Sequence, residues 1–401
     1  MRIVGGAYRE RCANPRHDAL IGSGMRAAAS LAESGGDVEL TTAVHESEQL
    51  EAGVVADTLG VTVDMVERTR PVSFAYFTPL NAPVIGGLGS RISNDISVEG
   101  DAVLLFGLIE SGQVRAKGQR VVVDPQRPRN LTEEDLPEVE ADEQAWVLNE
   151  RETTQLAGVQ DVFAAARRLV EARGLSVVVT KRGPQGALVT TADGHQVNVG
   201  ACVTESVFPI GSGDVFAGTF AWAWADKHLD PVDAANIASN AAAHWCETKD
   251  FATPAYVLDG TFTRELVPTI KARPVYLAGP FFNLQQRWLV DVVNASLAPH
   301  VWSPSHEIGA GGIEVARQDL DGLELCDSVL ALLDDNDQGT VFEVGYATKM
   351  DIPVVMYTEH VDAEGSKMLL GTGTTHYEDL STAVYKSQWA AAFRAAARES
   401  G

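Results

Sequence analysis

Short apolar runs alternate with helical segments along this chain, and this alternation limits its fold more than any other feature. Runs typical of β-strands lie at residues 38–44, 102–108, 121–124 and 177–180, with helical segments between several of them. These runs are largely apolar, as in parallel sheets whose two faces are both covered by helices. The sequence therefore predicts an α/β fold with parallel strands.

The alternation stops and then starts again, which indicates two domains. A less regular stretch covers residues 249–273, and the chain of 401 residues is longer than one core usually reaches. We place the first domain at residues 1–262 and the second at residues 273–401. The elements expected in the second domain are strands at 275–278, 328–333 and 352–357 and helices at 285–297, 315–326 and 340–349.

The composition restricts the class of partner. Acidic residues outnumber basic ones by 55 to 31, and the formal net charge is −24. This balance argues against nucleic acid and anionic membranes as partners, and no apolar run reaches the ~20 residues of a membrane span. The four cysteines lack metal-ligand spacing, which fits reduced thiols in a cytoplasm. We expect a cytoplasmic protein that binds small molecules and has no direct metal-ligand set.

A glycine-rich turn before a helix predicts an anion-binding site. Residues 211–214 read Gly-Ser-Gly-Asp and precede an apolar helical run. Small residues let backbone N–H groups turn towards an anion, and the helix dipole adds to them. Asp214 would lie beside the bound group as a base, although so short a motif is often only an N-cap in a tight turn. Residues 72–78 are expected to form an antiparallel flap over the mouth of a site.

Residues 1–262 resemble the ribokinase-like (PfkB) family of carbohydrate and nucleoside kinases. The matching motifs are Asp-Pro at 124–125, Asn-Glu-Arg-Glu at 149–152, Val-Thr-Lys-Arg-Gly-Pro-Gln-Gly at 179–186 and the turn at 211–214. The resemblance implies a three-layer α/β domain that uses ATP and Mg²⁺ to phosphorylate a nucleoside or pentose. Such transfer depends mostly on positioning and electrostatic stabilisation.

The same resemblance implies roles for individual residues. Asp214 would deprotonate the acceptor hydroxyl, and the amides of residues 211–213 would stabilise charge on the γ-phosphate. Asn149 and Glu152 would position magnesium and phosphate, although an Asn followed three residues later by a Glu is also a helix-capping pattern. The positions implied for the anion hole are Gly211, Ser212 and Gly213, and those for the nucleotide and magnesium are Asn149, Glu152, Thr180, Gly183 and Gly186.

Two positions depart from the family pattern. Arg26 stands where these kinases usually carry an asparagine at the sugar site. Because a guanidinium binds phosphate and carboxylate groups well, one hypothesis is that the acceptor carries negative charge; the alternative is an exposed helical arginine. Residues 207–210 (Val-Phe-Pro-Ile) replace a common Asp-Thr-Thr segment, so phosphate transfer could be weak or lost.

Residues 274–357 resemble the nucleoside 2-deoxyribosyltransferase family, including its nucleotide N-glycosidase relatives. The motifs are Tyr-Leu-Ala-Gly-Pro-Phe-Phe at 276–282, Ser-Pro-Ser-His-Glu at 303–307, and acidic segments at 319–327 and 334–347. The resemblance implies a flavodoxin- or Rossmann-like parallel α/β domain that needs no cofactor. Its expected reaction is cleavage of an N-glycosidic bond.

Cleavage of that bond needs a carboxylate beneath the anomeric carbon and a proton donor near the base. Glu343 is the expected nucleophile, in the first turn of a helix whose dipole would favour its ionised form; the alternative is a helix N-terminal acid placed for stability. By resemblance, Tyr276 would orient Glu343, and Asp319 and Asp337 would contact or protonate the base. The expected substrate-binding residues are Gly279, Pro280, Phe281, Ser303, Ser305 and His306.

Together these features predict a bifunctional enzyme whose ligands are nucleosides, nucleotides or pentoses. Both families commonly assemble, so we expect a homo-oligomer. In the transferases an asparagine from a neighbouring subunit usually completes the site, but residues 367–376 contain none, so base transfer and hydrolysis both stay open. A second hypothesis treats the first domain as a ligand sensor without kinase activity that controls a nucleotide-degrading second domain.

Overall fold

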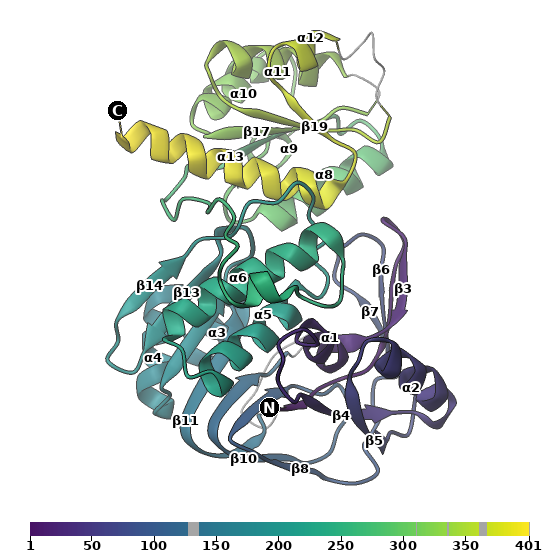
Figure 1. The fold of residues 1–401 in the computed structure, drawn as a ribbon. Helices are drawn as coiled ribbons and strands as arrows, with labels where there is room; N and C mark the ends of the chain where they lie inside the picture. Colours follow the sequence, from purple (N-terminus) through teal and green to yellow (C-terminus); the bar gives the residue numbers. More distant parts are fainter. Residues whose placement is uncertain (127–135, 310, 335–336, 361–366, 401) are drawn as a thin grey trace. The chain divides into compact units, whose positions relative to one another are not determined.

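The computed structural model describes residues 1–126, 136–309, 311–334, 337–360 and 367–400 (Figure 1). The chain divides into two compact units. Unit 1 contains Met1–Thr204 and Phe208–Leu266, and unit 2 contains Glu205–Val207 and Val267–Gly401. The short piece Glu205–Val207, before the turn at residues 211–214, is thus part of unit 2, where the amide of Val207 donates to the hydroxyl of Thr382 at 2.9 Å.

Unit 1 is built on a ten-stranded sheet in the order β14-β13-β12-β11-β10-β9-β1-β4-β5, with β8 paired to β10. The strand pairs from β5 to β12 are parallel, and the pairs that add β13 and β14 are antiparallel. The strands are β1 (Arg2–Val4), β4 (Glu39–Val44), β5 (Thr62–Glu67), β8 (Ile96–Glu99), β9 (Ala102–Phe106), β10 (Val114–Asp124), β11 (Glu138–Asn149), β12 (Val177–Lys181), β13 (Ala187–Thr191) and β14 (Gln196–Val199).

Helices cover both faces of this sheet, which confirms the predicted three-layer α/β fold. The sequence dictates several of their ends: α6, for example, begins with Pro231, and Asp230 accepts a hydrogen bond from the amide of Val232 at 2.8 Å. The helices are α1 (Gly22–Ser30), α2 (Gln49–Thr58), α3 (Glu150–Ala157), α4 (Val162–Arg173), α5 (Ser212–Ala221), α6 (Pro231–Thr248) and α7 (Ala255–Leu258), with short turns η1 (Glu46–Glu48) and η3 (Gly183–Gln185) and a π-helical turn η4 (Trp222–Asp226).

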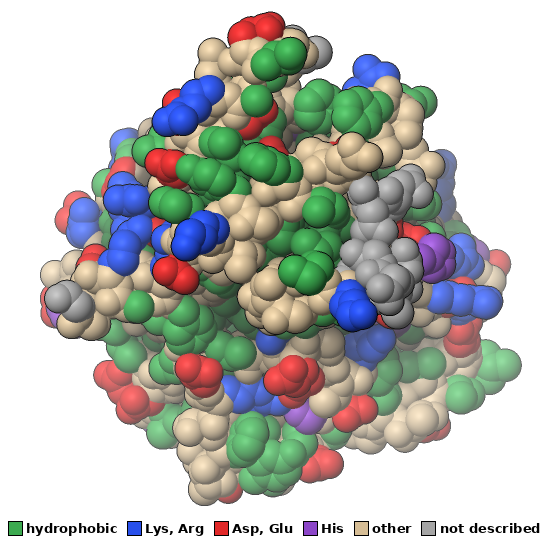
Figure 2. All heavy atoms as spheres, turned by 90° about the horizontal axis from the view of Figure 1, so that it is seen from above, with side chains coloured by type: hydrophobic (Ala, Val, Ile, Leu, Met, Phe, Trp, Pro, Cys, Tyr) green, Lys and Arg blue, Asp and Glu red, His purple; other side chains and the backbone are tan. Residues whose placement is uncertain are grey.

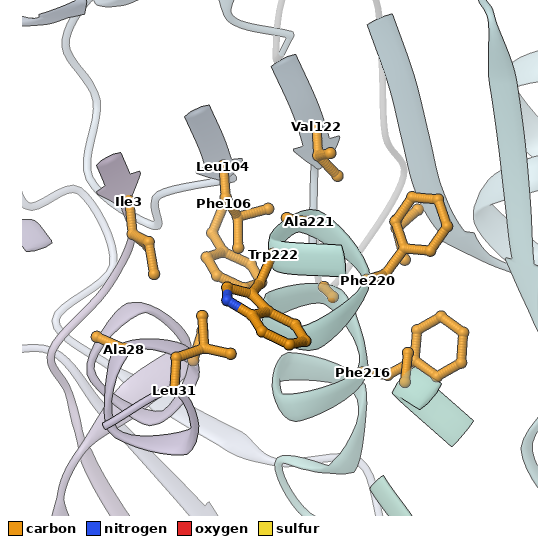
Figure 3. Packing of buried hydrophobic residues seen from close by; sticks show 14 of the residues in the cluster. Ile3, Ala28, Leu31, Leu104, Phe106, Val122, Phe216, Phe220, Ala221 and Trp222 are labelled. Atoms are coloured by element: carbon orange, nitrogen blue, oxygen red, sulfur yellow. The ribbon is translucent and has the colours of Figure 1, made fainter. Parts of the chain in front are cut away.

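Unit 1 has two separate hydrophobic cores, because successive side chains of each strand point to opposite faces of the sheet. Leu104 and Val122 face α1 and α5, whereas their neighbours Val103 and Val121 belong to the core that contains residues of α4. Figure 3 shows the first of these cores, in which side chains of β1, β9 and β10 meet Phe216 and other aromatic residues of α5 and η4. This packing fixes α5, and with it the turn at residues 211–214, against the sheet.

A second, small sheet stands at one side of unit 1, in the order β3-β2-β6-β7. Strand β6 lies in the segment where the flap was expected; it pairs antiparallel with β7 but parallel with β2. The strands are β2 (Arg9–Cys12), β3 (His17–Leu20), β6 (Ser73–Tyr76) and β7 (Val84–Gly86).

Unit 2 is a five-stranded parallel sheet in the order β16-β15-β17-β18-β19. Counted along the chain this is the order 2-1-3-4-5 of flavodoxin-like folds, as predicted. Figure 1 shows the long helix α13 lying along this sheet. The elements are β15 (Val275–Ala278), α8 (Leu284–Leu297), β16 (Val301–Trp302), α9 (Pro304–Glu307), α10 (Val315–Glu324), β17 (Ser328–Leu332), α11 (Gln338–Lys349), β18 (Val354–Tyr357), α12 (Lys367–Gly371), β19 (Thr375–Tyr377) and α13 (Leu380–Ser400).

Among the described residues, no helix combines the length and the apolar character that a membrane span requires. Figure 2 shows acidic, basic and apolar side chains interspersed on the face that it presents.

Candidate active sites

A cavity of about 430 Å³ lies in unit 1 where four parallel strands end. Gly107 follows β9, and Asp124, Asn149 and Lys181 are the last residues of β10, β11 and β12. The start of α5 closes the cavity with Gly211, Gly213 and Asp214. Because the carboxyl ends of parallel strands meet at one edge of a sheet, residues far apart in sequence converge here.

Two of the three positions predicted for the anion hole, Gly211 and Gly213, lie close to basic side chains. Gly211 has φ +84°, and a Cβ there would lie 2.2 Å from Nε of Arg26, so only glycine fits. A Cβ on Gly213 would lie 3.5 Å from Nζ of Lys181, which places an ammonium group beside the turn. Ser212 corrects the prediction: its amide and its hydroxyl both donate to the carbonyl of Pro209, at 3.1 and 2.9 Å, so it is committed elsewhere.

Both carboxylate oxygens of Asp214 are held by side chains of the protein. Nη1 of Arg26 donates to Oδ2 at 2.6 Å, and Nε2 of Gln126 donates to Oδ1 at 2.6 Å. Arg26 also binds both oxygens of Glu10. Gln126 has φ +41°, an unusual backbone conformation for a residue other than glycine. The candidate base is thus tied on both sides.

Arg26 is neither an exposed helical residue nor a free ligand for an anionic acceptor, which corrects both readings of the sequence. Its side chain is fully buried, and its guanidinium lies 5.0 Å from the ring centre of Trp245. Burial lowers the pKa of Arg26, but the carboxylates of Glu10 and Asp214 raise it by more. Burial also raises the pKa of Glu10, against the opposing effect of Arg26. The positive charge is therefore already used inside the protein.

A second charged group borders the same cavity. Nζ of Lys181 lies 2.5 Å from Oδ2 of the fully buried Asp124. Burial raises the pKa of Asp124, Lys181 opposes this, and Glu152 adds to it. The other oxygen of Asp124, Oδ1, is buried without a hydrogen-bond partner.

The donor set around Asp124 decides whether this cavity suits magnesium. No group of three His, Cys, Asp or Glu side chains in the described part of the chain is placed to hold a metal ion. Magnesium in kinases is, however, usually held by one or two carboxylates together with the phosphates of the substrate. The unpartnered oxygen of Asp124, close enough to Glu152 for their charges to interact, has the chemistry that such a site requires.

Asn149 and Glu152 line the cavity and also form a complete capping box at the start of α3. Oδ1 of Asn149 accepts from the amide of Glu152 at 2.8 Å, and the amide of Asn149 donates to Oε2 of Glu152 at 2.9 Å. The capping interpretation of the pair is thus confirmed, and both residues also border the cavity.

None of the three nucleotide-binding positions predicted on β12 and its turn lines the cavity. Thr180 is fully buried and its hydroxyl lies 3.1 Å from that of Thr153, so its assignment is corrected: Lys181, on the opposite side of the strand, reaches the cavity instead. Gly183 and Gly186 shape the turn before β13 with φ values of +54° and +87°. A Cβ on Gly186 would lie 2.0 Å from the carbonyl oxygen of Val199.

The candidate site of unit 2 lies at the reversal of strand order between β15 and β17, where ligands bind in open α/β sheets. The hydroxyl of Tyr276, on β15, donates to Oε1 of Glu343, on α11, at 2.6 Å. The ring of Tyr276 is stacked on Trp302 of β16, with ring centres 5.2 Å apart. Tyr276 is thus fixed on both sides and holds one oxygen of the carboxylate.

The electrostatics of Glu343 differ from the expectation. Asp337 caps α11, which begins at Gln338, so Glu343 lies in the second turn of the helix and not in the first. Burial raises the pKa of Glu343 to about 7, although the hydrogen bond from Tyr276 opposes this. The charges of Asp319 and Asp337 add to the increase. The predicted position in the first turn is therefore wrong, and burial of the carboxyl group opposes its ionisation.

Asp319 and Asp337 have distinct surroundings. Asp319 is half-buried on α10, and burial raises the pKa of its carboxyl group, as a proton donor requires. Oδ2 of Asp337 accepts hydrogen bonds from the amide and the hydroxyl of Thr340, at 2.8 and 2.9 Å. Asp337 therefore has a capping role beside its electrostatic effect on Glu343.

The predicted substrate-binding residues follow β15 and β16 at the same edge of the sheet. Pro280 and Asp334 border a small cavity of about 90 Å³. Nδ1 of His306 lies 3.0 Å from the hydroxyl of Ser305, and Nε2 lies 3.1 Å from Asp291. The remaining predicted positions at this edge are Gly279 and Phe281 after β15, and Ser303, which is buried and whose hydroxyl lies 3.1 Å from that of Ser305.

The sequence did not single out three residues of the first site: Glu10, Gln126 and Lys181. Lys181 lies inside the motif at 179–186, where strand alternation separates it from Thr180 and could have identified it. No local pattern marks Glu10 or Gln126.

Comparisons with known proteins agree with this division. Residues 105–255 match the family model of pfkB family carbohydrate kinases, and residues 275–378 match that of nucleoside 2-deoxyribosyltransferases. A stretch of 107 residues is 33% identical to 5-dehydro-2-deoxygluconokinase of Photobacterium profundum, over 25% of this chain and 32% of that protein. The chain thus spans about a third of the length of this curated relative.

Solved structures of ribokinase-type kinases are similar to this chain at low identity. A pyrophosphate-dependent kinase in the ribokinase family, complexed with a pyrophosphate analogue and myo-inositol, has a TM-score of 0.48 and 15% identity over 65% of this chain and 98% of its own. Phosphofructokinase-2 from Escherichia coli in complex with potassium has a TM-score of 0.47 and 14% identity over 65% of this chain and 97% of its own. The chain joins a ribokinase-like (PfkB) domain to a nucleoside 2-deoxyribosyltransferase-like domain.

Proposed function

We propose that unit 2 cleaves the N-glycosidic bond of a nucleoside or nucleotide through Glu343. The observation that carries this proposal is the hydrogen bond of 2.6 Å from Tyr276 to Oε1 of Glu343, at the point where strand order reverses. It fixes one carboxylate oxygen and leaves the other to attack the anomeric carbon. In this step the bond from Glu343 to the carbon forms while the bond from the carbon to the base nitrogen breaks.

Asp319 would supply the proton that the departing base needs, because burial favours its protonated form. The electron pair of the broken bond goes to the base nitrogen, which takes this proton. In the second step another base, or water, attacks the anomeric carbon and releases Glu343, and the attacking group returns its proton to Asp319. Transfer and hydrolysis share the first step and differ only in the second.

Incubation of the chain with each nucleoside and each nucleoside 5′-monophosphate, with and without an acceptor base, tests this proposal. Chromatography would show release of free base, and formation of a new nucleoside if transfer occurs. A folded chain that releases base from none of these compounds would contradict the proposal.

The Tyr276→Phe variant should shift the pH dependence of base release. Glu343 must be ionised to attack, so the rate should rise with pH around the pKa of about 7. Tyr276 donates to the carboxylate and lowers that pKa, so its loss should move the rising limb to higher pH and reduce the rate at pH 7. A rate–pH profile measured for both proteins checks this. An unchanged profile would mean that Tyr276 does not control the charge of Glu343.

For unit 1 we propose phosphorylation of a nucleoside or pentose by ATP, with Asp214 as the base. The amides of Gly211 and Gly213 and the ammonium group of Lys181, which is paired with Asp124, would face the transferring phosphate, and Asp124 and Glu152 would hold magnesium. When bound, magnesium neutralises charge on the phosphate oxygens. Asp214 would take the proton of the acceptor hydroxyl as its oxygen bonds to phosphorus. Gln126 would have to release Oδ1 of Asp214 first.

The hydrogen bond from Gln126 to Oδ1 of Asp214 favours a second candidate function, in which unit 1 binds its ligand without turnover and acts as a sensor. ADP release with a panel of nucleosides and pentoses separates the two. A kinase should lose turnover in Asp214→Asn and keep it or gain it in Gln126→Ala, where Oδ1 is free. A sensor should bind ligand but release no ADP in the wild type or in Gln126→Ala.

A further inference from the structure

We infer that the cavity of unit 1 selects a neutral nucleoside, rather than a free pentose or a nucleotide, as its acceptor. This inference rests on the proposal that the cavity binds the acceptor. Two features carry it: a wall of aromatic rings, and two carboxylates close to it, Glu10 and Asp214, that share the charge of one arginine.

The ring wall is made by Tyr8 and by two residues of β6, Phe74 and Tyr76. Strand β6 pairs with β2 in parallel, with Phe74 opposite Glu10 and Tyr76 opposite Cys12. Because alternate residues of a strand share a face, Phe74, Tyr76 and Glu10 face the same way, and all three line the cavity. The rings of Tyr8 and Phe74 lie 5.5 Å apart, centre to centre.

Tyr8 supports the ring wall from within: it is 4% exposed, and the guanidinium of Arg68 lies 5.2 Å from its ring centre. The hydroxyl donates to Oε2 of the buried Glu110 at 2.8 Å and accepts from the amide of Ile109 at 3.2 Å. Oε1 of Glu110 in turn accepts a hydrogen bond from Nη1 of the buried Arg68 at 3.0 Å. Phe74 is partly exposed, lines the cavity and packs on this anchored ring, so it is suited to stacking on a planar base, which a free pentose lacks.

The charges of the cavity disfavour an anionic acceptor. Its described lining contains four carboxylates and two basic side chains, Lys181 and Arg151, and Lys181 is paired with Asp124. The charge of Arg26, beneath the cavity, is shared by Glu10 and Asp214. A phosphate on an acceptor held at the ring wall would lie close to Glu10 and Asp214, whereas sugar hydroxyls could donate hydrogen bonds to them. The carboxylates that line the cavity are Glu10, Asp124, Glu152 and Asp214.

Calorimetric titration of the full chain carrying Glu343→Gln, which should not consume the ligand, tests the inference. The probes are adenosine, uridine, adenosine 5′-monophosphate and ribose. We expect a class of sites that binds the nucleosides at least tenfold more tightly than the monophosphate or ribose. The Phe74→Leu variant keeps an apolar side chain without a ring and should lose about tenfold or more in affinity at this class. The matched control is Phe77→Ala, which removes a ring that is 58% exposed just after β6 and should change nothing.

The outcomes separate the inference from the proposed function. Ribose that binds as tightly as the nucleosides, or a Phe74→Leu variant that binds them normally, would overturn the inference but leave the proposed kinase intact. Tighter binding of the monophosphate in the sites sensitive to Phe74 would also overturn it. Absence of any site sensitive to Phe74→Leu for all four probes, together with no ADP release, would overturn both. Base release by Phe74→Leu with Glu343 intact should match the wild type, since that readout reports unit 2.

Discussion

A chain carrying Glu343→Gln is expected to release base from nucleosides at least ~10³-fold more slowly than the wild type. The amide keeps the size of the carboxylate and an oxygen that can accept the hydrogen bond from Tyr276, but it is a far weaker nucleophile. Chromatographic assay of free base with the best nucleoside of the panel measures the loss. Residual activity above a tenth of the wild type would mean that another group attacks the sugar.

The same variant carries its own control for folding. The pKa of Glu343 is raised from its ordinary value of 4.5 to about 7, so the folded state favours the protonated form. Between pH 4.5 and about 7, the carboxyl group of Glu343 is mostly ionised in the unfolded chain but mostly protonated in the folded chain. The wild type therefore loses stability relative to the variant as the pH rises through this range. The Tm of unit 2 should therefore be equal in both proteins at pH 4 and higher in Glu343→Gln above pH 7. A variant that is less stable at pH 8 would make loss of activity uninformative.

The sequence located most elements whose signal is local. Strand β15 was predicted at its observed bounds, and α11 within two residues of its start, because an apolar run or an acidic cap marks each of them. Strand β10 was predicted only at residues 121–124, although it begins at Val114. Its first half carries Lys117, which pairs with Glu140 of β11 at 2.6 Å. Such a pair forms only when the two strands meet, so neither strand shows an apolar pattern there.

The candidate site residues, like the helices and strands, were predicted where their sequence signal is local. Short motifs marked Asp214 and Glu343 as candidates, because each lies within the first two turns of a helix that follows a recognisable sequence. The partners of Asp214 are remote: Arg26 lies 188 positions away, and Gln126 lies 88 positions away. A lone arginine on a short helix looks like a surface residue, and only the folded chain shows that it is buried between two carboxylates. The charge state of Glu343 was missed for a related reason, since desolvation depends on the tertiary surroundings.

The Arg26→Met variant is expected to destabilise unit 1 by about 3–5 kcal/mol. Methionine fills much of the space over Trp245, but it leaves Glu10 and Asp214 buried without the guanidinium that both carboxylates bind. Urea unfolding followed by tryptophan fluorescence should show that unit 1 of the variant unfolds at a lower urea concentration than unit 1 of the wild type. Base release by unit 2 should continue at urea concentrations below that transition.

Removal of all three charges together should restore most of that loss. A chain with Arg26→Met, Glu10→Gln and Asp214→Asn has no buried carboxylate left without its cation, and replacing a whole buried ion group with neutral residues is often close to neutral in stability. Arg9→Ala is the matched control, because Arg9 is a neighbouring arginine whose pairs with Asp18 and Glu51 are exposed. Its loss should change stability little, since surface pairs contribute little. If Arg26→Met alone unfolds at the urea concentration of the wild type, or if the triple variant is no more stable than the single one, then the destabilisation does not come from unpaired charge and Arg26 does not hold Asp214 in place.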